Sequence, residues 1–414
     1  MSQGIPEFRE KVRRVSVVRP DNLGDAVLFS GALRHIRAHY PQAEITLCVK
    51  QCVKNLLELC PHVDRILLWE DMYFPPPWLP WVRGRERLEL WVQYVMNLKS
   101  RADVLLLPVR SPYPHMHTLI QAIRAGEKYG IAGDLCNQSS EDDHSAEAIY
   151  SARLRLPPDR RREHEIFVTT DYLRFLGIEV TADDLWPEFW TEARDLQWAE
   201  KSIPQCRDTV TLAICPGVRS PRGKSYPAGN YARALSGLVK THFVVVLFGS
   251  ASDVSICEDV VQYLDWCKNV MSVVNLAGQS SIRQLVEGLR RCDAVLASDA
   301  APLHIGVALG KPTVGIVGGG HYGRFYPWGN SIINRVANLS MNCYWCQWNC
   351  RYPSFRCIQE IPPELVAREL QTALSLVGQG VDSRRREKSV TERKSSLSDD
   401  TAADNPRYGV ARNE

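Results

Sequence analysis

Three turns of the chain combine a charged side chain with glycine or proline, a composition typical of loops that bind anions or transfer protons. The first is Asn22-Leu23-Gly24-Asp25, which places a carboxylate at the start of an apolar-periodic segment. Asp25 could act as a general base that removes a proton from a sugar hydroxyl group. An aspartate in this position also caps helices, and the sequence alone leaves both roles open.

The second turn is basic and follows a short β-rich run. Gly217 lies near its start, and Arg219, Arg222 and Lys224 fall within six residues of one another. Cationic side chains interleaved with free backbone amides can bind a diphosphate. Ser225, just ahead of an expected helix, would help to fix the loop. Solvated surface charge is the alternative.

The third turn opens the segment ASDAAPLHIGVALGKPTVGIVGGG, which begins at residue 297. Asp299 precedes Ala300 and Ala301, whose backbone amides would lie at the start of a short helix. Amides at a helix N-terminus form a ready site for an anion. His304, one turn inside the helix, would serve either as a hydrogen-bonded structural residue or in catalysis.

Several glycines of the carboxyl-terminal half lie at the ends of expected strands and helices. Gly310 fits the left-handed stop of the short helix, and a buried strand is expected at 313–317. The glycines at 318–320 would then let the backbone approach a ligand closely. Gly249, after a strand at 243–248, begins a similar strand-to-helix turn, which simple turn chemistry also explains.

The glycine cluster continues into Gly318-Gly319-Gly320-His321-Tyr322-Gly323, which satisfies the G-x-G-x-x-G expression of dinucleotide sites. That motif needs a helix directly after it and an acidic residue about twenty positions later. The sequence offers neither, so a nicotinamide-dependent oxidoreductase is not expected.

Four cysteines near the carboxyl end, Cys343, Cys346, Cys350 and Cys357, give the spacing C-x2-C-x3-C-x6-C. Four thiols so close in the chain suit a structural Zn2+ or Fe site. The spacing departs from paired C-x2-C knuckles, so two local disulfides or free thiols remain open. The other cysteines are scattered through apolar segments, where buried thiols are expected.

Short β-rich runs alternate with helical segments along most of the chain. This alternation is typical of parallel sheets covered by helices, and its restart near residue 209 predicts two similar α/β domains that face each other. Strands are expected at 15–19, 44–49, 65–69, 103–109, 210–214, 243–248, 273–276, 294–297 and 313–317, and helices at 26–38, 254–264, 282–291 and 362–377.

The composition is that of a globular protein, with 414 residues, 45% hydrophobic and 23% charged. A net charge of +3 is too small to imply nucleic-acid binding. No apolar run is long enough to span a bilayer, and the amino terminus lacks the apolar core of a signal peptide. These features predict a cytoplasmic protein.

Three segments depart from the α/β pattern. The insert at 73–91 is rich in proline and tryptophan, and is either a surface loop with an amphipathic helix or a contact to an acceptor or membrane surface. A basic run between Arg153 and Arg162 is either a solvated face or a surface for anionic lipid or a phosphorylated acceptor. Residues 379–414 have the composition of a disordered tail.

Taken together, four short motifs resemble glycosyltransferase family 9, the ADP-heptose:lipopolysaccharide heptosyltransferases. The resemblance covers residues 12–375 and implies a GT-B fold, an inverting mechanism and a nucleotide-diphosphate sugar donor. The motifs are Asn22-Leu23-Gly24-Asp25, Pro216-Gly217 with Lys224-Ser225-Tyr226-Pro227, Asn275-Leu276-Ala277-Gly278, and Ser298-Asp299-Ala300-Ala301-Pro302-Leu303-His304.

The resemblance also implies a division of the chain. Two Rossmann-like domains with parallel sheets would face each other, the first binding the acceptor and the second binding the donor. The expected parts are the acceptor domain at 1–185, a linker at 186–208, the nucleotide-sugar domain at 209–340, the cysteine cluster at 341–360, a helix at 361–378 and the tail at 379–414.

By position, Asp25 matches the general base of the family and Lys224 its phosphate-binding lysine. Asp299 with the amides that follow it matches the donor-binding turn, and His304 the family's histidine. Family members usually carry a hydroxyl residue and a glycine where this chain has Ala300-Ala301. The predicted donor-binding set is Gly217, Arg222, Lys224, Ser225, Gly249, Asp299, Ala300, Ala301 and His304.

Catalysis is expected to need no metal cofactor. Lys224, Arg222 and the helix N-terminus near Pro302 would stabilise the departing diphosphate by fixed positive charge and helix dipole. A structural Zn or Fe ion at the cysteine cluster is a separate expectation.

The predicted function is therefore transfer of a sugar, with heptose from ADP-heptose favoured, to a lipopolysaccharide-core or other surface-glycan acceptor, in the cytoplasm or at the inner face of the cell membrane. The cysteine cluster is absent from the standard lipopolysaccharide enzymes, whereas related protein heptosyltransferases carry a cysteine-ligated metal finger. A protein O-heptosyltransferase is thus one alternative. A non-catalytic nucleotide-sugar-binding protein and a metal-stabilised interaction protein are the others.

Overall fold

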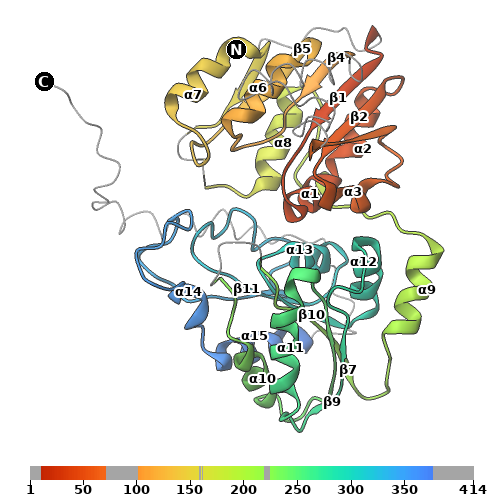
Figure 1. The fold of residues 1–414 in the computed structure, drawn as a ribbon, viewed down its shortest axis with the longest axis vertical. Coiled ribbons are helices and arrows are strands. Elements are labelled where there is room, and N and C mark those ends of the chain that lie inside the picture. The colour runs from red at the N-terminus through yellow and green to blue at the C-terminus, as the bar shows by residue number, and fades with distance from the viewer. Residues whose placement is uncertain (1–10, 71–100, 158–159, 161, 219–223, 376–414) are drawn as a thin grey trace, which may run out of the picture.

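Two α/β domains, each built on a six-stranded sheet, make up the described part of the protein (Figure 1). The computed structural model describes residues 11–70, 101–157, 160, 162–218 and 224–375. The predicted insert at 73–91 and the tail at 379–414 lie outside these residues.

The amino-terminal sheet is parallel and has the strand order β3-β2-β1-β4-β5-β6. Its central strand β1 pairs with β2 on one side, where Val15 lies opposite Ile45, and with β4 on the other, where Val17 lies opposite Leu106. All four side chains are buried, as expected for strands covered on both faces. The strands are β1 Arg14–Val18, β2 Glu44–Val49, β3 Arg65–Leu68, β4 Arg101–Leu106, β5 Arg124–Ala132 and β6 Ala152–Arg155, and the α-helices are α1 Leu23–Ser30, α2 Ala32–His39, α3 Gln51–Leu57, α6 Pro114–Ala122, α7 Ser140–Ser145 and α8 Glu165–Phe175.

The carboxyl-terminal sheet is also parallel and has the order β12-β11-β10-β7-β8-β9. Every residue of β8 is buried, which fits its run of β-branched and apolar side chains. The strands are β7 Val210–Cys215, β8 Phe243–Leu247, β9 Val270–Asn275, β10 Ala294–Ser298, β11 Thr313–Ile316 and β12 Asn334–Ala337, and the α-helices from the linker onward are α9 Ala193–Ser202, α10 Ala228–Ser236, α11 Val254–Leu264, α12 Ile282–Arg291, α13 Ala301–Ala308, α14 Arg356–Gln359 and α15 Pro363–Leu374.

Both sheets have the same topology. Counted from the start of each domain, the order is 3-2-1-4-5-6, that of the doubly wound fold. In this fold a crevice opens where the strand order reverses, at the carboxyl ends of strands one and four. Those strands are β1 and β4 in one domain and β7 and β10 in the other. The prediction of two Rossmann-like domains with parallel sheets is confirmed.

The two crevices meet at the boundary between the domains. Helices α1 and α3, on the lower edge of the amino-terminal domain in Figure 1, lie next to α13 and α12 of the carboxyl-terminal domain. The domains therefore face each other across the edges at which doubly wound sheets bind their ligands.

The expected helix at 26–38 is two helices in the structure, so that prediction is wrong in one respect. The chain breaks at Gly31, where any Cβ would collide with the carbonyl oxygens of Leu185 and Trp186. This constraint comes from a segment distant in sequence, so helical periodicity does not reveal it. The sequence also gives little sign of β5, whose first half is largely polar and exposed, or of the four-residue strands β6 and β12.

A buried ion network joins the two domains. Arg324, in the loop after β11, donates from Nε to Glu165 Oε1 at 2.8 Å and from Nη2 to Ser111 Oγ at 2.9 Å, and its Nη1 lies 3.3 Å from Asp134 Oδ2. Arg110 lies 3.4 Å from each of the same two carboxylates. Because ions buried this deeply need every partner, the network fixes this loop against the amino-terminal domain.

Two further contacts cross between the halves of the chain. Trp186 donates from its indole N–H to Ala308 O at 2.9 Å. Asp195, on helix α9 of the expected linker, accepts a hydrogen bond from Arg283 Nε at 3.1 Å. The linker region is thus packed on the carboxyl-terminal domain through α9.

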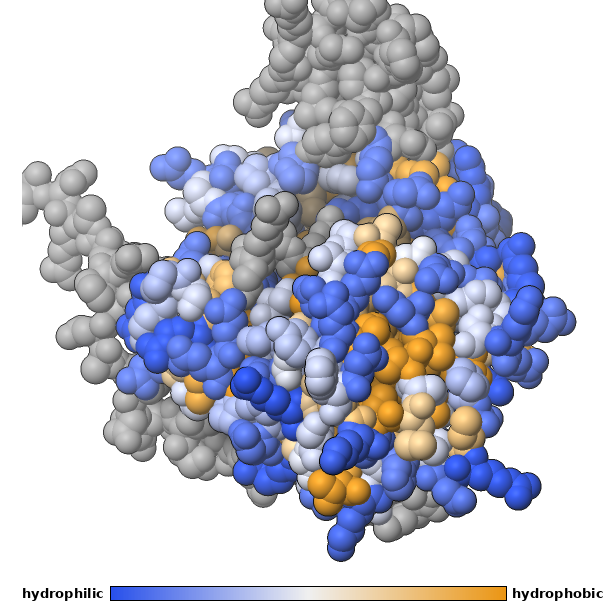
Figure 2. All heavy atoms as spheres, turned by 60° about the horizontal axis from the view of Figure 1, so that its bottom comes forward, coloured by the Kyte–Doolittle hydropathy of each residue, from blue (hydrophilic) through white to orange (hydrophobic). Residues whose placement is uncertain are grey.

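Among the described residues no helix is both long and apolar enough to cross a lipid bilayer. With the lower end of the carboxyl-terminal domain turned forward, Figure 2 shows a hydrophobic area bordered by hydrophilic residues. Exposed apolar side chains on elements of this domain include Val239, Tyr263, Trp266 and Met271.

Replacing Arg324 by methionine should destabilise the protein by roughly 3–5 kcal/mol, because it leaves Glu165 and Asp134 buried with less compensating charge. The matched control is Arg290→Met, whose guanidinium is half exposed beside Glu287 and should matter by about 0–1 kcal/mol. Denaturant or calorimetric unfolding of both variants checks this. Equal losses of unfolding free energy in Arg324→Met and Arg290→Met would contradict a structural role for the buried network.

Candidate active site

Asp25 lies in the first turn of α1, directly after the loop at the carboxyl end of β1. Its Oδ2 accepts a hydrogen bond from the backbone N–H of Asn22 at 3.3 Å, so the carboxylate contributes to capping. Lys50 Nζ donates to Asn22 Oδ1 at 3.2 Å and ties this loop to the end of β2. A capping role and a catalytic role are compatible, since one carboxylate oxygen makes the cap.

The protein environment makes Asp25 a weaker acid than usual. Burial, followed by the neighbouring carboxylate of Asp21, raises the pKa of Asp25 to about 7, while the charge of Arg19 opposes this shift. Glu165 raises this pKa and Arg324 lowers it by smaller amounts. A general base is most effective when its pKa lies near the working pH, so this carboxylate suits proton removal near neutrality.

The N-terminus of α13 lies at the carboxyl end of β10. Its N-cap residue is Ala300, which has no side-chain oxygen to accept a hydrogen bond from the first helical amides. Pro302 occupies the first turn, where its missing N–H costs nothing, and Gly310 has φ +73° at the end of the helix. The short, delimited helix is confirmed, and its first amides are left without a side-chain cap.

His304 is buried within α13 and is held in one tautomer. The indole N–H of Trp328 donates to His304 Nδ1 at 3.0 Å, so Nδ1 is the acceptor and the proton of the neutral ring is on Nε2. Nε2 lies 3.8 Å from Asp299 Oδ1. Burial lowers the pKa of His304 to about 3, so the ring is neutral and orients its neighbours rather than transferring protons near pH 7.

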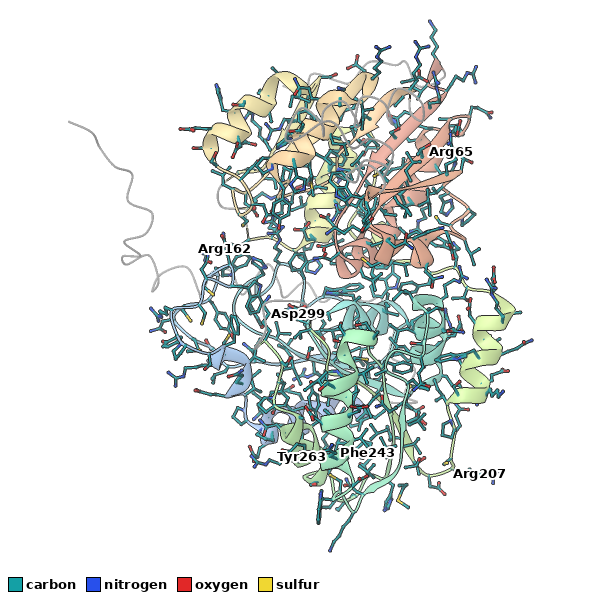
Figure 3. All side chains as sticks on the ribbon, in the orientation of Figure 1. Arg65, Arg162, Arg207, Phe243, Tyr263 and Asp299 are labelled. Atoms are coloured by element: carbon teal, nitrogen blue, oxygen red, sulfur yellow. The ribbon has the colours of Figure 1, made fainter. Side chains whose placement is uncertain are left out.

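Close packing against His304 brings the two crevices together. A Cβ added to Gly24 would lie 3.2 Å from His304 Cδ2 and 3.8 Å from the backbone nitrogen of Ala301. The NLGD turn of the first domain therefore rests on the start of α13 in the second. Asp25, next to this contact, and Asp299, beside the same imidazole, belong to one site between the domains. Figure 3 shows Asp299 at the edge of the lower domain that faces the upper one.

Lys224 follows β7 and thus lies at the other side of the second crevice. Burial lowers its pKa to about 8, and the carboxylate of Asp299 opposes that shift. Burial in turn raises the pKa of Asp299 to about 6, opposed by Lys224. Ser225 comes next in the chain, ahead of α10. Arg222, with Arg219, lies outside the described residues.

Gly217 and Gly249 follow β7 and β8 and both pack on Asp253. A Cβ at Gly217 would lie 2.6 Å from Asp253 Oδ1, and one at Gly249 would lie 2.7 Å from Asp253 Cβ. Asp253 also accepts hydrogen bonds from the N–H and hydroxyl of Ser250. Turn packing accounts for both glycines, and their contact with a donor stays a prediction.

The glycines at 318–320 were expected to meet a ligand, and the structure corrects this. A Cβ at Gly319 or Gly320 would collide with the ring of Tyr344 or Trp348 respectively, and one at Gly318 would touch Ile358 and Trp348. Aromatic side chains of residues 341–360, the cysteine segment, contact the backbone here. The glycines therefore allow the cysteine segment to pack closely on the edge of the sheet.

The four clustered cysteines lie in this segment and carry no disulfide, as is true of all thirteen cysteines of the chain. Burial raises the pKa of the Cys357 thiol, a hydrogen bond from the Gly319 N–H opposes this shift, and Cys343, Cys346 and Cys350 add smaller increases. Within the described ranges no three His, Cys, Asp or Glu side chains are grouped as metal ligands. The metal site stays a prediction.

The basic run near residues 153–162 is largely engaged in ion pairs. Arg153 is buried against Asp143 and Glu147, and Arg155 pairs with Glu147 at 2.7 Å. Arg160 also pairs with carboxylates, and Arg161 lies outside the described residues. These pairs occupy charge that a lipid-binding surface would need, and the burial of Arg153 also departs from the expected solvated face.

Sequence reasoning missed three residues that shape the site: Trp328, which fixes His304; Arg324, which joins the domains; and Trp348, which contacts Lys224. Their only signal was the aromatic content of HYGRFYPWGN and NCYWCQWNC. An open hollow of about 550 Å3, lined by residues including Arg37 and Asp64, lies at the amino-terminal ends of β2 and β3 and is remote from the site.

A sequence model of one protein family, described as glycosyltransferase family 9 (heptosyltransferase), matches residues 139–352. The chain belongs to glycosyltransferase family 9. It is 23% identical over 328 residues to lipopolysaccharide heptosyltransferase 2 of Escherichia coli (strain K12), covering 74% of this chain and 82% of that protein. This glycosyltransferase is thus related to enzymes over most of its length.

Solved structures confirm the GT-B fold of the glycosyltransferase. The family 9 glycosyl transferase of Veillonella parvula DSM 2008 superposes with a TM-score of 0.70 at 16% identity, covering 91% of this chain and 100% of that one. The E. coli heptosyltransferase WaaC with ADP-2-deoxy-2-fluoro heptose gives 0.57 at 14% identity, with 86% and 99% covered.

We expect the purified glycosyltransferase to contain about one Zn or Fe ion per chain, because the sequence places four cysteines between residues 343 and 357, the number of ligands that such sites use. Elemental analysis of the native protein and of Cys346→Ser tests this. Cys206→Ser, an exposed cysteine remote in sequence from the cluster, is the control. A metal content that is zero, or that is unchanged in Cys346→Ser, would contradict the prediction.

Proposed function

We propose that this family 9 glycosyltransferase transfers heptose from ADP-heptose to a lipopolysaccharide-core acceptor with inversion at the anomeric carbon. The observation that carries the proposal is the meeting of the two switch-point crevices. One supplies Asp25, with a pKa of about 7, and the other supplies Lys224 and the uncapped N-terminus of α13. A base and an anion site thus face each other across one boundary.

The proposed reaction is a single displacement. Asp25 removes the proton from the acceptor hydroxyl as its oxygen forms a bond to the anomeric carbon. The bond between that carbon and the diphosphate oxygen breaks, and its electron pair leaves with the diphosphate. The ammonium of Lys224 and the amides of Ala300 and Ala301 stabilise the developing negative charge. Fixed positive charge of this kind can do the work of a divalent ion, so we propose that catalysis needs none.

The choice of donor rests on the family and on the named relatives. The curated relatives are heptosyltransferases, and the WaaC structure contains an ADP-heptose analogue. The donor-binding set is proposed to include Lys224, Ser225, Asp299 and His304 with the first amides of α13. Among these, neutral His304, whose Nε2 lies 3.8 Å from Asp299 Oδ1, would shape the site by packing beside Asp299 rather than by transferring a proton.

Two classes of acceptor, a lipopolysaccharide core and a protein, fit the proposed transfer. A lipopolysaccharide core is favoured by the curated relatives. A protein acceptor is supported by the cluster Cys343, Cys346, Cys350 and Cys357, because the family resemblance associates a cysteine-ligated metal finger with protein heptosyltransferases. A location at the inner face of the cell membrane is proposed with the lipid-linked acceptor. Assay of heptose transfer onto each acceptor class separates the two.

Replacing Asp25 by asparagine should lower turnover by roughly 10²- to 10⁴-fold, because the amide cannot accept the proton. Binding of ADP should be unchanged within about twofold. In the wild type, kcat/KM should rise with pH through about 7, since only the ionised carboxylate is a base. Steady-state rates from pH 5 to 9 check both points. Retained turnover, or a wild-type profile flat across pH 7, would remove Asp25 from the mechanism.

Replacing Lys224 by methionine should weaken ADP binding roughly 10- to 100-fold, as expected when a charge-assisted hydrogen bond to phosphate is lost. Lys268→Met is the matched control, because Lys268 is exposed between α11 and β9. Calorimetric titration with ADP measures both affinities. An affinity that stays the same in Lys224→Met would show that the lysine does not bind the diphosphate.

A further inference from the structure

The side chain of Lys224 rests on the face of the Trp348 indole. Its Nζ lies 3.5 Å from the ring centroid, which is a close cation–π contact. The two residues come from different parts of the carboxyl-terminal half. Lys224 follows β7 in the predicted donor site, whereas Trp348 lies between Cys346 and Cys350 in the cysteine segment.

The indole is fixed from several sides. Atom Cη2 lies 3.0 Å from the position of a Cβ at Gly318, and the ring overlaps the position of a Cβ at Gly320. The rings of Phe355 and His321 pack edge to face against it, with centroids at 5.9 and 6.1 Å. Moving this ring away from Lys224 would therefore require its contacts with Phe355, His321 and the glycine backbone to be lost.

Backbone hydrogen bonds attach the same segment to the sheet edge. Trp345 N–H donates to Gly319 O at 2.8 Å and Gln347 N–H donates to Gly320 O at 3.1 Å. The glycines at 318–320 thus serve to let a flat indole lie directly on the backbone. The cysteine segment becomes a wall of the crevice at the ends of β7 and β10.

We propose that Trp348 is a positioning residue of the donor site, which holds the ammonium of Lys224 ready for the diphosphate. A free lysine side chain must give up rotamer freedom when it binds a phosphate, and a ring that already holds it reduces that loss. The contact also links the fold of the cysteine segment to donor affinity. This inference rests on the proposed role of Lys224.

The test is calorimetric titration of the full chain with ADP. Trp348→Leu should weaken binding roughly 3- to 30-fold, the range expected for loss of a partly desolvated cation–π contact. Trp348→Phe, which keeps an aromatic face, should restore most of the affinity. The matched control is Trp345→Leu, which lies in the same segment with a similar φ of +66° but contacts Arg162 instead. It should bind ADP within twofold of the wild type.

A double variant separates positioning from general damage to the fold. In a Lys224→Met background, Trp348→Leu should cause no further loss of ADP affinity, because the ring acts through the ammonium. Equal affinity of Trp348→Leu and Trp345→Leu overturns the proposal. The proposal is also overturned if Trp348→Leu causes an equally large loss of ADP affinity in the Lys224→Met background.

A second readout does not depend on the donor. Acetylation of Lys224 by a small acylating reagent, followed by mass spectrometry, should be faster in Trp348→Leu than in Trp345→Leu, since the ring no longer shields the amine. An unchanged rate overturns the positioning role. If the wild type binds no ADP while this rate does change, the proposed donor is wrong and the contact between Trp348 and Lys224 is upheld.

Discussion

The contact between Gly24 and His304 is the constraint on which the rest of the site depends. A Cβ at position 24 would lie 3.2 Å from the imidazole, closer than ordinary van der Waals contact, so glycine lets the NLGD turn pack tightly on His304. The imidazole is in turn fixed by the Trp328 indole, which donates to its Nδ1. Two helix N-termini, from α1 and α13, are thereby brought to one place. Their amides create a positive potential that favours an anionic ligand.

Two carboxylates, those of Asp25 and Asp299, are buried beside this potential, and burial has a different consequence for each. Asp25 is raised to a pKa of about 7 and Asp299 to about 6, so both hold protons more strongly than aspartates in water. Asp25 gains basicity where an acceptor hydroxyl would need it. Asp299 Oδ1 lies 3.8 Å from His304 Nε2, and the charge of Asp299 opposes the lowering of the Lys224 pKa by burial. The same desolvation therefore tunes the proposed base in one domain and the proposed anion site in the other.

The chemistry-bearing turns could be predicted because each is local. Asp25, Lys224 and Asp299 each lie in or just after the segment that connects a β-rich run to the next helix, and the carboxyl ends of parallel strands necessarily share one edge of a sheet. The strand at Glu44–Val49 and the helices at Val254–Leu264 and Ile282–Arg291 have the predicted bounds for the same reason. Nothing in these segments requires knowledge of distant residues.

What the sequence did not reveal depends on contacts between distant segments. The need for glycine at position 31 comes from the carbonyls of residues 185 and 186, and the pairing of Arg324 with Glu165 joins two domains. The glycines at 318–320 led to a wrong prediction, since a glycine indicates that a group packs closely on the backbone but not which group it is. Here the approaching groups are aromatic rings, and no periodicity distinguishes a ring from a ligand.

The central claim is that the base and the leaving group are held by opposite domains, so that the acceptor attacks the face of the sugar opposite the diphosphate. The configuration of the newly formed glycosidic bond tests this most directly. Proton NMR of the product as it first accumulates should show the anomeric configuration opposite to that of the donor. A product that keeps the donor's configuration would contradict the account, because a single displacement with Asp25 as the base cannot give it.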